Sequence, residues 1–172
     1  MNAWGQPLRL ADLARGPVRL SLAPDAAQRA EIAGALGVKS LPALTAEVQV
    51  APWLDGAALT GRIDAQVEQV CGVTLDPFVQ PVSADFEVRV VPAGSPHAPG
   101  DDGGELTLDL DAPDPPDVLQ GDEIDVAAYV VEHLALELDP FPRKPDAAFE
   151  FASDPAESSP FAALKGLKTR HE

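Results

Sequence analysis

The sequence has one cysteine, Cys71, among its 172 residues, so it cannot form an intramolecular disulfide. A secreted disulfide-rich scaffold is therefore excluded, and we expect a reducing compartment. The sequence also has no apolar run of about 18 residues, which excludes a transmembrane helix. Its first residues lack a basic cluster followed by an apolar stretch. We therefore expect no signal peptide and a soluble, cytoplasmic protein.

Positive charge is also scarce, because 12 Lys and Arg residues face 28 Asp and Glu residues, for a net charge of −16. This balance excludes a nucleic-acid-binding surface that extends over the whole protein. The hydrophobic fraction of 45% is sufficient for a folded core. Residues 93–142 contain 13 acidic residues and no Lys or Arg. We predict a single domain over residues 1–172, with an acidic loop at about 93–122 and a short helical tail at about 159–172.

Three consecutive runs alternate apolar with polar residues, which is the period of a strand with one buried and one solvated face. They cover residues 44–50, 58–71 and 81–91. In the second run, Leu59, Ile63 and Val67 fall on one face. Short turns between the runs favour an antiparallel meander. We predict an α+β fold whose antiparallel sheet could close into a barrel, with helices packed on it and the acidic loop as an insertion.

Two segments have helical spacing and terminal signals. The first follows Pro24-Asp25 and ends near Leu36, with Gly37 at the position of a C-terminal cap. The second follows Asp125, a candidate N-cap, and places apolar residues at helical spacing until Pro140 and Pro142. We expect the second helix to cover the apolar face of the sheet. Two short strands are predicted at 8–10 and 18–22, separated by a turn at Gly16-Pro17.

Residues that could support catalysis or metal binding are few and dispersed. None of the three histidines, His97, His133 and His171, has a second histidine at ligand spacing, and Cys71 has no cysteine partner. The acids of the loop do not follow the order of a calcium-binding EF-hand. Motifs for nucleotide binding and serine hydrolysis are absent. We therefore predict no enzymatic activity, no cofactor and no metal, and we expect Cys71 to be a buried, unreactive thiol.

The order of four segments resembles the bacterial YceD family, also called DUF177. These segments read VCGVTLDPF at 70–78, VSADFEVRV at 82–90, DEIDV at 122–126 continuing into VVEHLALELDP at 130–140, and SPFAALKGLK at 159–168. The resemblance implies a ribosome-biogenesis factor for accumulation of large-subunit ribosomal RNA, with no established catalytic activity. In that family the gene commonly neighbours the gene of a small basic protein of the large subunit.

The resemblance also implies candidate contact residues. Cys71 matches the first cysteine of the Cys-x-x-Cys-Leu pattern common in the family, and Thr74 stands at the second. The chain therefore lacks the second thiolate that a metal site there would need. We take as candidate partner-binding residues the family's helix positions and the C-terminal cations with their apolar neighbours. They are Asp125, Glu132, Arg143, Lys144, Phe161, Leu164, Lys165 and Lys168.

Three functional hypotheses follow. The first is a non-enzymatic assembly factor whose acidic segment binds a basic large-subunit ribosomal protein, while the basic C-terminal region contacts rRNA. The second is direct rRNA recognition, which requires arginines to converge with the C-terminal cations on one positive face. Those arginines are Arg9, Arg15, Arg19, Arg62 and Arg89. The third is a metal-dependent or thiol enzyme built around His133 or Cys71, and it has the least support. No membrane or small-molecule partner is expected.

Overall fold

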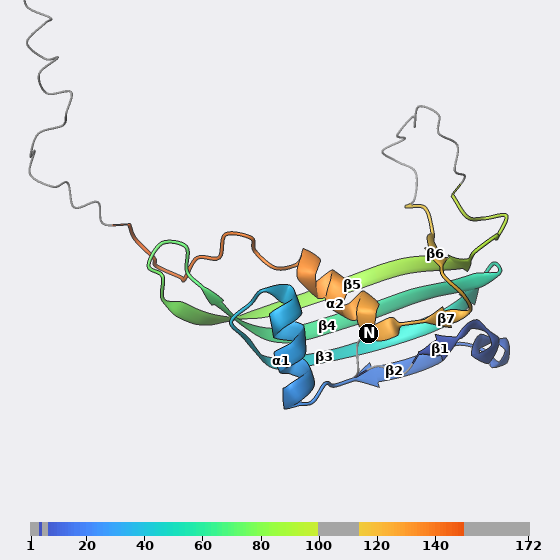
Figure 1. The fold of residues 1–172 in the computed structure, drawn as a ribbon, viewed down its shortest axis with the longest axis horizontal. Helices are drawn as coiled ribbons and strands as arrows, with labels where there is room; N and C mark the ends of the chain where they lie inside the picture. Colours follow the sequence, from blue (N-terminus) through green and yellow to red (C-terminus); the bar gives the residue numbers. More distant parts are fainter. Residues whose placement is uncertain (1–3, 5–6, 100–113, 150–172) are drawn as a thin grey trace, which may run out of the picture.

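The computed structural model of the chain describes residue 4 and residues 7–99 and 114–149, and Figure 1 shows their arrangement. The elements are β1 (Leu8–Arg9), the 3-10 helix η1 (Leu10–Arg15), β2 (Val18–Leu22), α1 (Ala26–Leu36), β3 (Ser40–Trp53), β4 (Gly56–Val70), β5 (Pro77–Pro92), β6 (Asp117–Leu119), β7 (Glu123–Ile124) and α2 (Val126–Leu136). Residues 100–113 of the predicted acidic loop and the whole predicted tail at 159–172 lie outside the described residues. Neither α1 nor α2 nor η1 is long and apolar enough to span a lipid bilayer.

Three long strands, β3, β4 and β5, form the predicted antiparallel meander. The β3–β4 pairing extends from Ser40 opposite Glu68 to Trp53 opposite Gly56, and the β4–β5 pairing covers nearly the whole of β4. The predicted alternation is confirmed, because Leu59, Ile63 and Val67 are each 0% exposed. The residues of the opposite face, Thr60, Arg62, Asp64 and Gln66, are exposed. One face of the meander therefore forms one side of the hydrophobic core.

The main sheet is mixed and open rather than wholly antiparallel. Its strand order is β2-β3-β4-β5-β6, and β6 runs parallel to β5 with Val118 opposite Val91. The prediction of an antiparallel sheet is therefore wrong at this edge. More than a dozen residues separate β5 from β6, which is enough for the chain to return in the same direction. In the described part of the chain, β2 and β6 stay at opposite edges, so the sheet does not close into a barrel.

Two helices cover the apolar face of the main sheet. This is the face that would line the interior if the sheet closed into a barrel. Helix α1 packs on β3 and helix α2 packs on β5 (Figure 1). The predicted start of α1 is confirmed, because the Asp25 carboxylate accepts a hydrogen bond from the Gln28 N–H at 2.9 Å. Its predicted end is confirmed by Gly37, which has the left-handed φ of 67° typical of a C-terminal cap. Helix α2 ends at Leu136, one turn before the prolines that were expected to end it.

A second, two-stranded sheet joins the N-terminal part of the chain to the start of α2. Strand β1 pairs antiparallel with β7, with Leu8 opposite Ile124. The Leu10 N–H donates to the Asp122 carbonyl at 2.9 Å, and Arg9 Nε lies 3.2 Å from Glu123 Oε1. Ile124 is 0% exposed and belongs to the same core as the main sheet. This pairing holds the entry to α2 in place.

A close approach between β4 and β5 sets the position of α2. Gly61 lies opposite Phe86, and a Cβ at Gly61 would lie 2.5 Å from Cε1 of the Phe86 ring. The ring fills this space and stacks on His133 of α2, with ring centroids 4.7 Å apart and an interplanar angle of 13°. Phe86 therefore packs between a glycine of the sheet and an aromatic ring of the helix.

This contact predicts a large effect of a small side chain. Gly61→Ala should push the Phe86 ring against His133 and lower the free energy of unfolding by about 1–3 kcal/mol, the usual cost of overpacking. Urea denaturation measures the change. Gly34→Ala in α1 is the control, because its Cβ would meet nothing within 4 Å. That helical substitution should raise stability by about 0.5–1 kcal/mol. If Gly61→Ala is as stable as the parent protein, or if the two substitutions change stability equally, this account of the packing is wrong.

Candidate functional site

Four of the eight candidate partner-binding residues lie in the described part of the chain. Asp125 is the N-cap of α2, and its Oδ1 accepts a hydrogen bond from the Ala128 N–H at 3.0 Å. Glu132 is exposed on α2, and Arg143 and Lys144 are exposed on the segment that follows it. The other four, Phe161, Leu164, Lys165 and Lys168, lie outside the described residues. Asp125 therefore has a structural role, whereas Glu132 is available for a contact.

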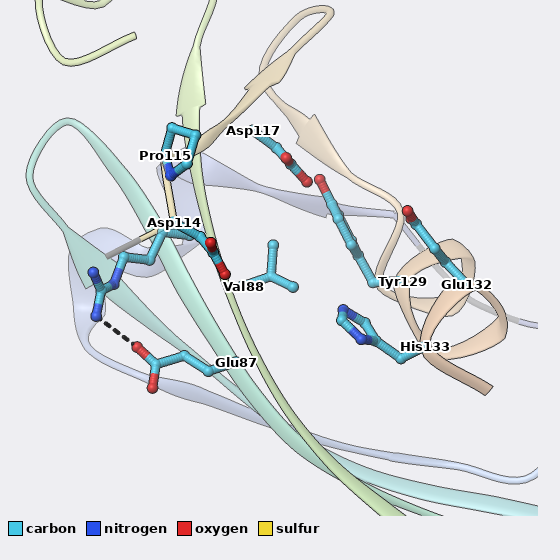
Figure 2. Close-up of a pocket in the computed structure, with 9 residues that line it drawn as sticks. Glu87, Val88, Asp114, Pro115, Asp117, Tyr129, Glu132 and His133 are labelled. Atoms are coloured by element: carbon cyan, nitrogen blue, oxygen red, sulfur yellow. Dashed lines mark hydrogen bonds and ion pairs between the residues drawn. The ribbon is translucent and has the colours of Figure 1, made fainter. Parts of the chain in front are cut away.

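Glu132 lies at a pocket of about 430 Å³ between β5, α2 and the start of β6 (Figure 2). Strand β5 supplies one wall, α2 supplies a second, and the residues that lead into β6 supply the third. The lining consists of Glu87, Val88, Arg89, Asp114, Pro115, Asp117, Tyr129, Glu132 and His133. The sequence placed Glu132 and His133 on one helix. It contained no signal that this helix would lie against β5 beside Asp114 and Asp117.

The pocket carries uncompensated negative charge. Its only lining cation, Arg89, already has partners, because its Nη2 lies 2.8 Å from Glu87 Oε1 and its guanidinium lies 5.5 Å from the centre of the Trp53 ring. The carboxylates of Asp114, Asp117 and Glu132 form no ion pair with any described residue. Three carboxylates therefore face the pocket without a cation of this part of the chain.

Burial and the negative charge of the pocket both raise the pKa of the Tyr129 phenol. Burial is the largest factor that raises the pKa of its phenol above the usual 10.0. The negative charge of Asp117 and the hydrogen bond to its carboxylate raise the pKa further, and the charge of Glu132 acts in the same direction. Figure 2 shows the Tyr129 hydroxyl beside the Asp117 carboxylate. The phenol therefore stays protonated and acts as a donor to Asp117.

His133 is partly buried on α2. Its ring stacks on Phe86, so the imidazole is held by the core contact described above. Among residues 7–99 and 114–149, no group of three or more His, Cys, Asp or Glu side chains is arranged to hold a metal ion. The acids of the pocket are therefore not arranged as a metal site in this part of the chain.

Cys71 lies at the turn after β4 in a polar cage of backbone groups. Its predicted burial is confirmed, since it is 0% exposed. Its Sγ accepts hydrogen bonds from the backbone N–H groups of Val73, Thr74 and Lys144, each at 3.4 Å. These bonds, the one from Lys144 first, lower the pKa of the thiol from 9.0 to about 6. The thiol therefore lies in a polar environment that the sequence did not indicate, and one of its three donors, the Lys144 N–H, comes from a distant part of the chain.

The arginines proposed for a positive face are interleaved with acids. Arg62 lies 3.3 Å from Asp64 and 3.8 Å from Asp85, and Arg89 is paired with Glu87. Arg19 donates to the Gln49 side chain on the same solvent-facing side of the sheet. Arg9 lies in the small sheet, paired with Glu123, and Arg15 ends η1. The five arginines are therefore spread over β1, η1, β2, β4 and β5. Three of them, Arg9, Arg62 and Arg89, are each paired with a neighbouring carboxylate.

Tyr129 is the only tyrosine of the chain, so a spectroscopic pH titration of phenolate reports on it directly. We expect the folded protein to ionise well above pH 10. Above pH 10 the unfolded chain releases this proton while the folded chain keeps it, so the free energy of unfolding should fall as pH rises. Asp117→Asn should lower the midpoint, because it removes the charge, and Glu31→Gln on α1 should leave it unchanged. A midpoint at the ordinary value would contradict the proposed environment.

Cys71 is the only thiol, so thiolate absorbance measures its ionisation. We expect a midpoint near pH 6 in the folded protein and near pH 9 in denaturant. Between these values the unfolded chain holds a proton that the folded chain has lost. The free energy of unfolding should therefore rise with pH over this window, and the contribution is lost as pH falls through 6. The variant Cys71→Ser has no thiol and is the control for absorbance that does not come from the thiolate. A folded-state midpoint near 9 would show that the three N–H groups do not stabilise the thiolate.

Comparison with known proteins assigns the chain to a family. The family described as "Large ribosomal RNA subunit accumulation protein YceD" matches residues 59–168, which is well over half of the chain. The match covers β4, β5, the pocket and α2. No curated protein and no solved structure matches the chain. The resemblance seen in the four sequence segments is therefore confirmed, and this chain belongs to the YceD family of large ribosomal RNA subunit accumulation proteins.

Proposed function

We propose that the protein is a non-enzymatic cytoplasmic factor that supports rRNA accumulation in the large ribosomal subunit by binding a basic ribosomal protein. Membership of the YceD family supports the role in large-subunit RNA accumulation. The observation that carries the choice of partner is the distribution of charge. Thirteen acids and no Lys or Arg lie in residues 93–142, and the pocket beside α2 leaves three carboxylates without a cation from the described chain.

Electrostatics explains how such a surface would assist assembly. Ribosomal proteins that neutralise phosphates are rich in Lys and Arg, and they bind RNA indiscriminately when they are free. An acidic surface attracts them at long range and occupies their cations until the specific RNA site competes. Because exposed ion pairs are individually weak, the partner can be released to the RNA. The acidic segment of this chain would then act as a carrier surface, and no bond needs to be made or broken.

Direct rRNA binding is the alternative, and one feature supports a limited form of it. Phe141 is 77% exposed, and Arg143 and Lys144 are exposed close to it in sequence. An aromatic ring beside cations can stack on an unpaired base and contact a phosphate. Asp76 lies 3.9 Å from the Lys144 ammonium, and Asp139 accepts from the Phe141 N–H, so acids also occupy this end. We therefore rank RNA contact below the binding of a basic protein.

Retention of purified large-subunit proteins on the immobilised full chain tests the proposal. We expect one or more basic proteins to be retained at an ionic strength of about 0.01 M and released at about 1 M, where the screening length falls from about 30 to about 3 Å. An unrelated protein of similar positive charge is the specificity control and should elute at lower salt. If no basic subunit protein is retained at low ionic strength, the proposal is wrong. Retention of rRNA fragments alone would favour the alternative.

A further inference from the structure

The geometry points to the pocket between β5 and α2 as a receptor for an arginine side chain of the basic partner. The identity of the partner class rests on the proposed function, but the pocket's preference for a guanidinium is a property of its own residues. Three features of the described pocket lead to this ligand: its walls, its charge, and the position of the chain's own arginine. Each is independent of the family assignment.

The walls suit a long side chain with a flat, charged end. Val88 and Pro115 offer apolar surface for a methylene stem, and Tyr129 and His133 present rings. The His133 ring is fixed by its stack on Phe86, so this wall is already in place before a ligand arrives. A guanidinium packs on aromatic faces, which a compact, strongly hydrated ammonium does less well. The volume of about 430 Å³ lies in the range of ordinary ligand pockets.

The charge of the lining selects a cation. Four carboxylates and one guanidinium line the pocket, so its formal charge is −3 with His133 neutral. Asp117 and Glu132 lie on different elements, β6 and α2, and both reach the side of the pocket where Tyr129 lies (Figure 2). Two carboxylates from different elements can accept from several of the N–H donors of a planar guanidinium. Because the carboxylates of the pocket are not arranged to bind a metal ion, an organic cation fits better than a divalent one.

The position of Arg89 leaves the pocket free for a guanidinium from outside. Arg89 is on β5 at the pocket's edge, yet its side chain pairs with Glu87 and lies over Trp53. The Glu87 carboxylate pairs with the charge of the guanidinium, and the Trp53 ring packs against its planar face. The chain's own arginine is therefore held at the rim, and the carboxylates of Asp114, Asp117 and Glu132 remain available. An arginine supplied by a partner would meet negative charge that no described cation has neutralised.

Titration of the isotope-labelled full chain with N-acetyl-arginine amide, followed by nuclear magnetic resonance, tests the inference directly. We expect saturable shifts of the amide signals of Tyr129, Glu132 and His133. The citrulline analogue, which has the same shape without the charge, should produce none, and the lysine analogue should bind more weakly. The variant Glu132→Gln should weaken arginine binding about fivefold, the effect expected for one exposed ion pair. Glu137→Gln removes the same charge from the same helix outside the pocket and should change affinity less than twofold.

The outcomes separate this inference from the proposed function. If the arginine analogue shifts no pocket signals, or if citrulline shifts them equally, the pocket is not an arginine receptor. Equal weakening by Glu132→Gln and Glu137→Gln would also overturn the inference, because it would show general attraction to the acidic helix. The retention experiment is then repeated with both variants. Loss of the partner only in Glu132→Gln supports the pocket as the contact. Undiminished retention by that variant leaves the proposed function in place and removes the pocket from it.

Discussion

The stack of Phe86 on His133, backed by Gly61, is the contact on which the arrangement of this molecule depends. It joins the central strands of the sheet to α2, and it is possible because β4 has no side chain at the point of closest approach. The same contact turns one side of α2 toward β5 and makes Tyr129 and Glu132 part of a pocket wall. A structural packing interaction thus determines where negative charge is presented.

The described surface separates paired charges from unpaired ones. On the solvent-facing side of the sheet, Arg62 and Arg89 lie beside carboxylates, and such pairs leave little net field. Around the pocket, Asp114, Asp117 and Glu132 form no ion pair with a described cation. The total charge of −16 therefore describes neither region well. What matters for a partner is the local excess of acids beside α2, because screening limits the reach of each charge to about 10 Å.

Local patterns predicted most elements, and long-range contacts account for most of the differences. The three alternating runs became β3, β4 and β5, and Asp25 and Asp125 cap their helices as their positions indicated. Alternation fixes the buried face of a strand, and cap residues act within one turn, so both are visible in a short window of sequence. Strand β6 was not predicted, since its residues fall within the predicted acidic loop. Its parallel pairing with β5 depends on where the chain returns to the sheet, which no local pattern indicates.

The candidate site was likewise predicted only where the signal is local in sequence. Glu132 was identified from its place in the family's helix signature, and it does line the pocket. Its neighbours Asp114 and Asp117 were read only as part of a solvated acidic segment, since nothing local places them beside a particular helix. The polar environment of Cys71 was missed for a similar reason, because one of its three donors, Lys144, comes from a distant part of the sequence. Convergence of this kind is created by the fold and has no periodic signature.

The pairing of β1 with β7 has a consequence for the order of folding. Arg9 and Glu123 are 114 residues apart in sequence, so their pairing closes a long loop and carries a large entropic cost if it forms first. The β3, β4 and β5 meander is built from neighbouring segments joined by short turns, and it can form with far less loop closure. We therefore expect β1 to pair late, on a sheet that has already formed, and to fix the entry of α2 there. The earliest described strand in the sequence would then be among the last to reach its final place.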